Sequence, residues 1–378
     1  MGENKKILCF TGTRADYGIY RPFLFEIEKC SFLDVQLVVT GMHLLEEYGK
    51  TINELREDPF YILSTPSILL KGDSRGAMSK SIGLATIYFA DIIDQAEPDA
   101  ILILGDRGEM LSAAISAHYL NVLIFHLHGG EKSGSADDAV RHAISKLSNF
   151  HFVSSFESKI RLISMQEKPS NIFVIGSLRK HDIQKIKNMN DTQKQFLSKK
   201  LKLSGSKKKI LFIMHPDSKE STPISSQINT TLAALREFTE TQLILLGTNS
   251  DAGGEVFSKY INEFVAQNKN ATYFHSLPAD EYLFLLSQVN VLVGNSSSGI
   301  IEAPFFNLPF INIGNRQKNR EHGDNVLHVD YNSSNIKKKI QKALSQINSH
   351  KKNPYNVVNS PAEEMIKFMD TLFNEQNK

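Results

Sequence analysis

The sequence predicts an α/β protein built from two Rossmann-like, doubly wound domains that face a cleft. Short, continuously apolar runs alternate with helical patterns along the chain, which is typical of parallel sheets buried on both faces. The chain has 378 residues, too many for one compact core. Ligands of such folds bind at the carboxyl ends of strands, so we expect the chemistry in the loops that directly follow strands.

The predicted strands and helices occur in both halves of the chain. The apolar runs that predict strands are 6–10, 35–39, 100–104, 122–127 and 172–175 in the first half, and 209–214, 242–246, 290–294 and 309–313 in the second. The helical patterns are 21–30, 108–119, 137–148, 227–239, 255–267, 279–287 and 299–305. This order predicts an N-terminal domain over 1–176, a C-terminal domain over 177–359 and a last helix within 360–378.

The domain boundary is predicted near 175–182, where a strand ends in Gly-Ser. The segment 360–373 is amphipathic, with Ser360 as N-cap and Pro361 at the first helical position. We expect this last helix to pack back toward the N-terminal domain.

Composition excludes several classes of protein. The chain carries 43 Lys and Arg against 41 Asp and Glu, so it lacks the strong basic field of a nucleic-acid binder. Its first residues show no signal or transit pattern, and no apolar run approaches the ~18 residues that would span a membrane. We therefore expect a cytoplasmic protein without nucleic-acid or membrane partners. Cys9 and Cys30 are expected to be small buried hydrophobes, and the absence of CxxC and HExxH argues against a structural zinc site.

Two loops of the first half carry charges directly after predicted strands. In "TGTRADYG" (11–18), Gly12 permits a tight turn and Arg14 can reach the mouth of the cleft, although Asp16 could simply cap a helix. In "LGDRGE" (104–109), the adjacent charges of Asp106 and Arg107 suit a polar ligand. The alternative is that Asp106 is the N-cap of a helix and forms a capping-box-like pair with Glu109.

The segment "HLHGGEKSGSADDAVRHAISK" (126–146) holds the densest group of ionisable side chains. Because His126 and His128 alternate in a predicted strand, we expect one of them to face the cleft and the other to pack. A purely structural role would explain part of the segment. Asp137 and Arg141 have the spacing of an ordinary helix pair, and so do Asp138 and His142. Ser135 could also cap the helix. That interpretation does not explain so many ionisable groups and glycines at the end of a strand.

The second half contains a histidine and a serine-rich turn at strand ends. His215 in "IMHPDS" follows an apolar strand and precedes a proline. In "VGNSSSGIIEAP" a strand runs into a helix, whose first N–H groups and serine hydroxyls could grip a diphosphate. Glu302 can accept two hydrogen bonds from a ribose diol, and Arg316 and Arg320 add positive charge. The alternative is a serine-rich helix cap.

Taken together, these motifs resemble the hydrolysing UDP-N-acetylglucosamine 2-epimerases of bacterial sialic acid synthesis. The matching elements are "TGTRADYG", "VTGMHL", "GDR", "HGGEKSGSADDAVRHAISKLS", "HP", "GNSSSGIIEAP" and "INIGNRQKNRE". The resemblance implies a glycosyltransferase-B-like fold without metal or cofactor, a homodimer or homotetramer, and the reaction of UDP-N-acetylglucosamine with water to give N-acetylmannosamine and UDP. It makes 177–359 the nucleotide-binding domain.

The resemblance also implies roles for individual residues. The candidates for catalysis are Asp106, Asp137, His128, Glu131 and His215. The candidates for contacts with the UDP-sugar are Arg14, Asp16, Arg107, Arg141, Asn249, Ser296, Ser297, Ser298, Gly299, Glu302, Arg316, Gln317 and Arg320. Many relatives have Glu where this chain has His128, so Glu131 is a candidate to compensate.

Three alternatives to this function are kept. The sugar could be a 2,4-diacetamido-2,4,6-trideoxyglucose, as in legionaminic acid synthesis. A glycosyltransferase of the same fold would transfer the sugar to an acceptor instead of releasing an epimer. A nucleotide-sugar sensor would bind the UDP-sugar without turnover.

Overall fold

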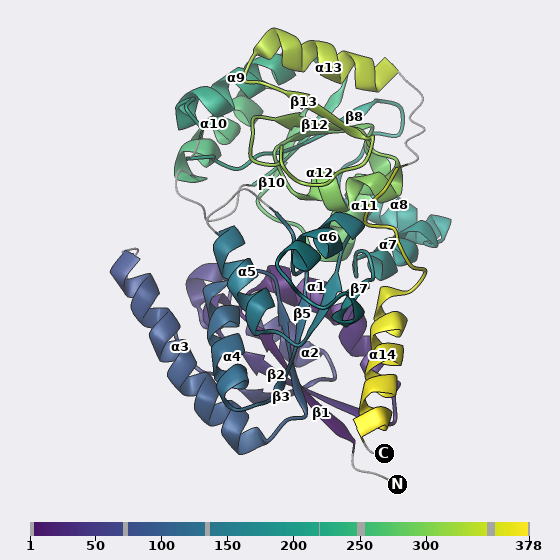
Figure 1. The fold of residues 1–378 in the computed structure, drawn as a ribbon. Coiled ribbons are helices and arrows are strands. Elements are labelled where there is room, and N and C mark those ends of the chain that lie inside the picture. Colours follow the sequence, from purple (N-terminus) through teal and green to yellow (C-terminus); the bar gives the residue numbers. More distant parts are fainter. Residues whose placement is uncertain are drawn as a thin grey trace. The chain divides into compact units, whose positions relative to one another are not determined.

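The computed structural model describes residues 4–70, 75–132, 137–218, 220–247, 254–345 and 352–376. The chain divides into two compact units, each taken by itself below (Figure 1). Unit 1 comprises Met1–Arg179 and Val357–Lys378, and unit 2 comprises Lys180–Asn356. Unit 1 extends beyond residue 176 because Ile175 and Leu178 are buried in its core.

Unit 1 contains a parallel sheet of seven strands in the order β3-β2-β1-β4-β5-β6-β7. The strands are β1 Lys5–Thr11, β2 Leu33–Val39, β3 Tyr61–Ser64, β4 Ala100–Leu104, β5 Leu123–Leu127, β6 Phe150–Val153 and β7 Ile172–Val174. The helices are α1 Arg14–Ile27, α2 Ile52–Glu57, α3 Arg75–Ala96, α4 Gly108–Tyr119, α5 Asp137–Leu147, α6 Phe156–Ser164 and α14 Pro361–Gln376, with 3-10 turns at Gly41–Leu44, Glu46–Tyr48 and Pro169–Asn171.

Each strand of this sheet supplies side chains to two cores, one on either face. In β1, Ile7 and Cys9 belong to the core that includes α1 and α14, whereas Leu8 and Phe10 belong to the core that includes α3 and α4. Successive side chains of a strand point to opposite faces, so a strand covered by helices on both sides must be apolar throughout. This is why the central strands appear in the sequence as unbroken apolar runs.

The C-terminal helix belongs to unit 1, far from its neighbours in sequence. It packs beside α1, and its Met365, Met369 and Phe373 are buried in the same core (Figure 1). Phe368 adds an aromatic contact, with its ring centroid 4.1 Å from that of Phe173 in β7. Burial of side chains of this size provides roughly 1.5–3 kcal/mol each, which holds the returning chain on the sheet.

Unit 2 repeats the architecture with a parallel sheet of six strands in the order β10-β9-β8-β11-β12-β13. The strands are β8 Lys209–Ile213, β9 Gln242–Leu246, β10 Ala271–Phe274, β11 Val291–Gly294, β12 Phe310–Ile313 and β13 Val326–Val329. The helices are α7 Lys180–Lys187, α8 Asp191–Lys200, α9 Ile224–Arg236, α10 Gly254–Gln267, α11 Ala279–Gln288, α12 Ser298–Ile301 and α13 Ser333–Ser345, with a 3-10 turn at Ala303–Phe306. One core includes α9, α10 and α13, and the other includes α7 and α11.

Both sheets have a point at which the strand order reverses. In unit 1 it lies between β1 and β4, and in unit 2 between β8 and β11. At such a point the loops that leave neighbouring strands diverge, and the carboxyl edge of the sheet opens into a crevice. The two predicted α/β domains are thus confirmed, and each places its charged loops at this edge.

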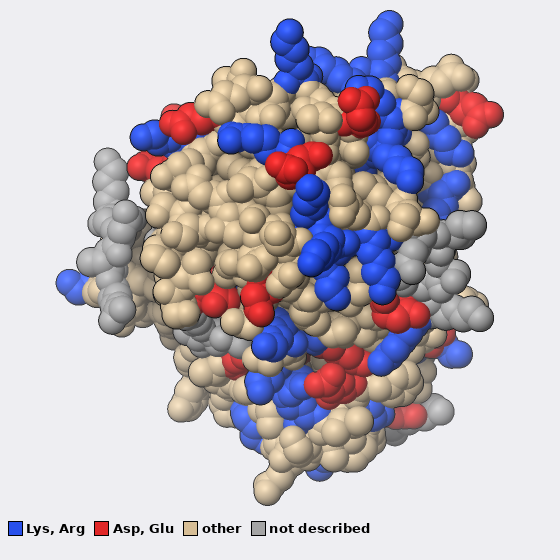
Figure 2. All heavy atoms as spheres, turned by 90° about the horizontal axis from the view of Figure 1, so that it is seen from above, with Lys and Arg blue, Asp and Glu red and all other residues tan. Residues whose placement is uncertain are grey.

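Three further observations concern the surface and the thiols. Lys and Arg lie interspersed with Asp and Glu on the face that Figure 2 shows, in keeping with their nearly equal numbers. Within the described ranges, no helix is both long and apolar enough to cross a membrane, and no cluster of three or more His, Cys, Asp or Glu could hold a metal ion. Cys9 is buried, Cys30 is half-buried, and both are free thiols.

Candidate active site

The loop after β1 is organised by the buried carboxylate of Asp16. Thr13 is the N-cap of α1, and Asp16 completes a capping box with it. The carboxylate also accepts from Thr11 Oγ1 at 2.7 Å and from Gly12 N at 3.1 Å. Burial raises the pKa of Asp16, although the bond from Thr11 opposes this. The structure therefore gives Asp16 the local role of shaping the turn that presents Arg14, whose exposed side chain pairs with Glu54 at 3.1 Å.

A histidine that the sequence analysis did not single out supports the same turn. His43, fully buried in the loop after β2, has Nε2 3.0 Å from Thr11 Oγ1 and Nδ1 2.8 Å from Thr51 Oγ1. Since the Thr11 hydroxyl already donates to Asp16, His43 Nε2 carries the proton and Nδ1 accepts from Thr51. Burial lowers the pKa of His43 to about 4. The motif "VTGMHL" could have pointed to His43, because this histidine lies shortly after a buried strand, as the predicted site residues do.

The loop after β4 differs from the helix cap considered above. The N-cap of α4 is Arg107, without a side-chain capping bond, and not Asp106. The Arg107 guanidinium instead donates from Nε to Glu109 Oε1 at 2.5 Å. Gly12 lies against the same Glu109 carboxylate, with no room for a side chain between them. Asp106 is therefore not used by the backbone of the helix.

The centre of the candidate site is a guanidinium between two carboxylates. Arg141 of α5 donates through Nη2 to Asp106 Oδ2 and through Nη1 to Glu131 Oε2, the latter at 3.3 Å. Only 4% of the Arg141 side chain is exposed. Burial alone would lower the pKa of Arg141, but the charges of Glu131 and Asp106 outweigh it and hold that pKa above its usual value. One cation thus joins the loops that follow β4 and β5.

Glu131 is held from two further directions. Ser154, directly after β6, donates to Glu131 Oε1 at 2.6 Å, and His128 Nδ1 lies 3.5 Å from the same oxygen. The expectation that His128 alternates with His126 in a strand was wrong, because β5 ends at Leu127 and His128 adopts a left-handed backbone with φ +59°. This turn brings His128 beside Glu131 instead of directing it to the opposite face.

The remaining candidates of this segment lie at or beyond the start of α5. Asp137 is the first residue of the helix and is exposed. The guanidinium of Arg141 reaches across to the neighbouring loops, so the ordinary helix pair predicted for it does not account for its position. The predicted capping residue Ser135 lies outside the described residues, as does the candidate contact Asn249.

In unit 2, Asn295 joins the two loops at the reversal of strand order. His215 N donates to Asn295 Oδ1 at 2.7 Å, and Asn295 Nδ2 donates to His215 O at 2.8 Å. The backbone carbonyl of Asn295 accepts from Arg316 Nη1 at 3.2 Å and from Gln317 Nε2 at 3.1 Å. This fully buried residue therefore brings three predicted contacts together. The sequence analysis missed it, although Asn295 directly follows a buried strand, as the predicted site residues do.

The serine-rich turn differs from the helix start that was predicted. The helix α12 spans only Ser298–Ile301, and a 3-10 turn containing Pro304 replaces its continuation. A dipole of one helical turn is small, and the N–H groups of Ser298 and Gly299 already bond to Ser296. The serine hydroxyls, buried in Ser296 and Ser298 and half-buried in Ser297, remain as donors. Tyr282 of α11 donates to Ser298 Oγ.

The other predicted contacts of unit 2 lie on the segments that follow β11 and β12. Glu302 is the half-buried C-cap of α12. Gln317 is buried, and the Arg320 backbone N–H closes the turn on Gln317 O at 3.2 Å. Glu220 holds this loop through Asn315, whose backbone N lies 2.6 Å from Glu220 Oε1.

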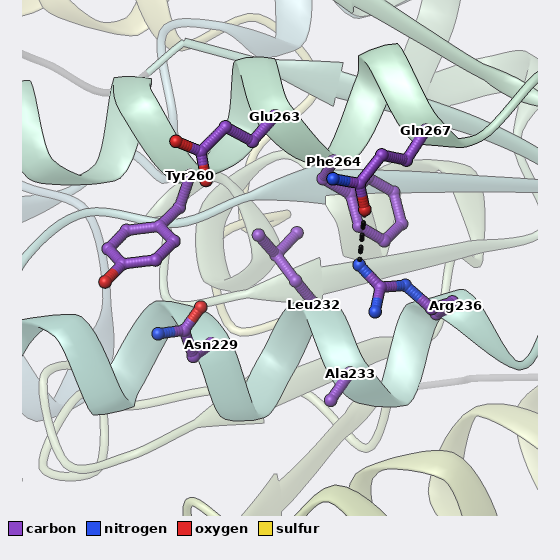
Figure 3. Close-up of a pocket in the computed structure, with 8 residues that line it drawn as sticks. All are labelled: Asn229, Leu232, Ala233, Arg236, Tyr260, Glu263, Phe264 and Gln267. Atoms are coloured by element: carbon purple, nitrogen blue, oxygen red, sulfur yellow. Dashed lines mark hydrogen bonds between the residues drawn. The ribbon is translucent and has the colours of Figure 1, made fainter.

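A hollow elsewhere in unit 2 does not coincide with these groups. Figure 3 shows it between α9 and α10, with Arg236 bonded to Gln267 at 3.2 Å across its floor. Its lining residues are Asn229, Leu232, Ala233, Arg236, Tyr260, Glu263, Phe264 and Gln267. It carries none of the groups predicted from the motifs, so we do not assign the reaction to it.

A family model described as UDP-N-acetylglucosamine 2-epimerase matches residues 26–369. The chain belongs to this family. A UDP-N,N'-diacetylbacillosamine 2-epimerase (hydrolyzing) of Legionella pneumophila is 40% identical over 342 residues, which cover 90% of this chain and 89% of the relative. A UDP-N-acetylglucosamine 2-epimerase of Neisseria meningitidis serogroup B is 34% identical over 343 residues, covering 90% and 88%.

Solved structures show the same fold. That of a UDP-GlcNAc 2-epimerase from Neisseria meningitidis bound to UDP-GlcNAc has a TM-score of 0.79 at 17% identity, covering 97% of this chain and 100% of that one. The predicted fold class and family are confirmed. The chain is an enzyme of the UDP-sugar 2-epimerase family, and the comparisons support hydrolysing activity.

Proposed function

We propose that this 2-epimerase acts on UDP-N,N'-diacetylbacillosamine, a UDP-2,4-diacetamido-2,4,6-trideoxyglucose, and releases UDP and the free 2-epimer of the sugar. The observation that carries the chemistry is the pairing of Asp106 and Glu131 on the single guanidinium of Arg141. The choice of sugar is supported by the Legionella relative. A second candidate is UDP-N-acetylglucosamine, with N-acetylmannosamine for sialic acid synthesis as the product, which the Neisseria relative supports.

The reaction needs groups that move protons at C2 of the hexose. No carbonyl group acidifies the proton on C2, so direct deprotonation is not feasible. The proton is instead removed as the bond between C1 and UDP breaks, which gives a glycal and UDP. Water then adds across the double bond, with hydroxide at C1 and a proton at C2 on the opposite face. A positioned base or acid contributes about 10²–10⁴-fold to such a step.

We assign the removal of the C2 proton to Asp106. Its carboxylate lies at the end of a buried strand and is oriented by Arg141, and it does not cap the following helix. Glu131, held by Ser154 and Arg141, is the group that takes a proton from the water attacking C1 and delivers a proton to the other face of C2. Asp137, exposed at the start of α5, is the alternative base.

Unit 2 is assigned to the UDP moiety. The hydroxyls of the serine-rich turn and the guanidinium of Arg316 supply donors for the diphosphate, and Glu302 supplies acceptors for the ribose. His215 lies at the same edge through its bonds to Asn295. Donors fixed before the reaction stabilise the charge that grows on UDP as it leaves.

The test is turnover of each UDP-sugar in D₂O, followed by NMR. We expect UDP and a free epimer with deuterium at C2. The two sugars differ at C4, where an acetamido group replaces a hydroxyl, and at C6, where the hydroxyl is missing. Even one methylene changes kcat/KM by roughly 10–200-fold, so we expect kcat/KM to favour the diacetamido sugar by at least about tenfold. The reverse preference would make UDP-N-acetylglucosamine the substrate.

Other results of the same experiment would contradict the proposal. Protium retained at C2 would exclude the elimination. Transfer of the sugar to an added acceptor without epimerisation would indicate a glycosyltransferase. Binding of the UDP-sugar without turnover would indicate a sensor.

We also propose that the chain forms a homodimer or homotetramer. Large apolar side chains are exposed on adjacent helices of unit 1, among them Met78 and Ile87 of α3, with 70% and 65% of their surface accessible, and Tyr119 of α4 with 80%. Exposed apolar patches of this kind are typical of protein interfaces. Sedimentation equilibrium at micromolar concentration would contradict this if it gave the mass of one chain.

A further inference from the structure

His126 is a buried histidine that the proposed mechanism does not use. It lies in β5, is fully buried, and its Nε2 is 2.9 Å from the backbone oxygen of Gly105. Gly105 directly precedes Asp106 and has a left-handed backbone with φ +77°. Its own N–H donates to Leu127 O at 2.9 Å. The N–H and the carbonyl of Gly105, the residue before Asp106, are thus both held by residues of β5.

The hydrogens of this arrangement can be assigned from the partners. A carbonyl oxygen only accepts, so His126 Nε2 carries a proton. Burial, opposed by the bond to Gly105, lowers the pKa of His126 to about 3, so the ring is neutral near pH 7. Its Nδ1 is therefore bare and accepts from the hydroxyl of Ser145, 3.2 Å away on α5.

Ser145 connects the ring to the helix that carries Arg141. Its hydroxyl also lies 3.0 Å from Arg141 O, one turn earlier in α5, so its single proton is shared between this carbonyl oxygen and His126 Nδ1. Gly129 packs close by, since a Cβ there would lie 2.9 Å from His126 Nδ1. The imidazole thus links the Gly105 carbonyl, directly before Asp106, to the Ser145 hydroxyl on the helix that carries Arg141.

We propose that His126 is a positioning residue for proton transfer, tying the peptide before Asp106 to the helix whose Arg141 orients the Asp106 carboxylate. This inference rests on the proposed function, in which Asp106 removes the C2 proton. Loss of the bond would leave the Gly105 carbonyl without its donor and let the loop shift. A displacement of about 1 Å at a reacting group can lower the rate by about 10²-fold.

A pair of variants separates the hydrogen bond from the bulk of the ring. His126→Gln places an amide N–H near the position of Nε2, whereas His126→Leu fills a similar volume without a donor. We expect His126→Leu to lower kcat by about 10²-fold with KM for the UDP-sugar within about threefold, and His126→Gln to recover most of the loss. Native kcat in His126→Leu, or equal losses in both variants, would overturn the proposal.

The isotope effect of a substrate deuterated at C2 distinguishes positioning from partial unfolding. A misplaced base slows the proton transfer itself, so the isotope effect on kcat should rise in His126→Leu. A smaller fraction of folded enzyme would lower kcat and leave the isotope effect unchanged, which would contradict the proposal. If His126→Leu does not fold, Ser145→Ala decides: kcat lowered severalfold at unchanged KM supports the role, and native kcat refutes it.

A structural test does not depend on the reaction. NMR of the full chain labelled with ¹⁵N-histidine should show His126 with a proton on Nε2 and none on Nδ1 near pH 7. A proton on Nδ1 would overturn the linkage whatever the activity. Turnover by the native enzyme without deuterium at C2 would instead contradict the proposed function, so the two failures can be told apart.

Discussion

The side chain of Asn295 forms a two-way bridge with the backbone of His215, accepting from its N–H at 2.7 Å and donating to its carbonyl at 2.8 Å. Asn295 follows β11, His215 follows β8, and these strands are neighbours at the reversal of order in the sheet. The bridge fixes the two loops relative to each other. It therefore makes Asn295 the residue on which the predicted nucleotide contacts of unit 2 depend.

Asn295→Asp should weaken the binding of UDP. The new carboxylate still accepts from His215 N–H, but its second oxygen cannot donate to the His215 carbonyl. It also brings a buried negative charge toward the proposed diphosphate site. We expect the Kd for UDP to rise at least about tenfold, or 1.4 kcal/mol, and the free energy of unfolding to fall by about 1–3 kcal/mol. Calorimetric titration and urea unfolding measure the two.

Asn290→Asp is the matched control. Asn290 precedes β11, and its Oδ1 accepts from Lys209 N at 2.8 Å. It thus makes a similar bond at the opposite end of the same two strands, and a carboxylate can accept equally well. Its Kd for UDP should stay within about twofold of the native value. Equal weakening in both variants would contradict the role assigned to Asn295.

Asp106→Asn should abolish proton transfer while leaving UDP affinity nearly intact. The amide keeps the size of the carboxylate but cannot take the C2 proton, so we expect kcat to fall by at least about 10²-fold. Asp99→Asn tests the other end of β4, where Asp99 accepts from Lys6 N at 2.8 Å, and activity there should be nearly native. If Asp106→Asn still turned over at the native rate and deuterium still entered C2, Asp106 would not be the base, and Asp137 would be the remaining candidate.

Arg141→Lys should impair turnover although it keeps the positive charge. A guanidinium can bond to Asp106 and Glu131 from separate nitrogens in a fixed geometry, whereas an ammonium group is a point charge on a flexible chain. We expect kcat to fall by about 10²-fold. Steady-state kinetics with the preferred UDP-sugar measure this change.

Arg21→Lys is the comparison for Arg141→Lys. Arg21 donates twice to Asp58, with both distances 2.7 Å, at a half-buried position of α1. This pair makes none of the bonds of the candidate site, so kcat should be nearly native even if the free energy of unfolding falls. If the two substitutions lowered kcat equally, the bridge at Arg141 would have no special part in the reaction.

Most central strands could be predicted, and so could the edge strand β7, but β6 and the edge strands β3, β10 and β13 could not. The runs in β1, β4, β8 and β9 are apolar because helices cover both of their faces. In contrast, β3, β10 and β13 lie at sheet edges and are partly exposed, so polar residues interrupt their pattern. Local sequence does not reveal such strands, because their pairing with a neighbour defines them.

For the site, the sequence predicted individual residues but not which of them contact one another. The motifs already contained Asp106, Glu131 and Arg141 as candidates. Their association depends on β5 lying beside β4, which no local spacing encodes, so Arg141 seemed to be the helix partner of Asp137. The role proposed for His126 could not be predicted either, since it depends on a carbonyl oxygen of the loop that follows β4.

Acidification should destabilise unit 1 through His43. Its pKa is about 4 in the folded chain against an ordinary value of 6.5, so between these values the unfolded chain binds a proton that the folded chain does not. Stability is therefore present above about pH 6.5 and lost as pH falls toward 4, by up to about 1.4 kcal/mol per pH unit. In His43→Gln, the fall in unfolding free energy between about pH 6 and 5 should be smaller by about 1 kcal/mol than in the native protein, as measured by urea unfolding. His118→Gln, on an exposed residue of α4, controls for the loss of a histidine as such. A native slope in His43→Gln would mean that burial does not keep the imidazole of His43 neutral in the folded chain.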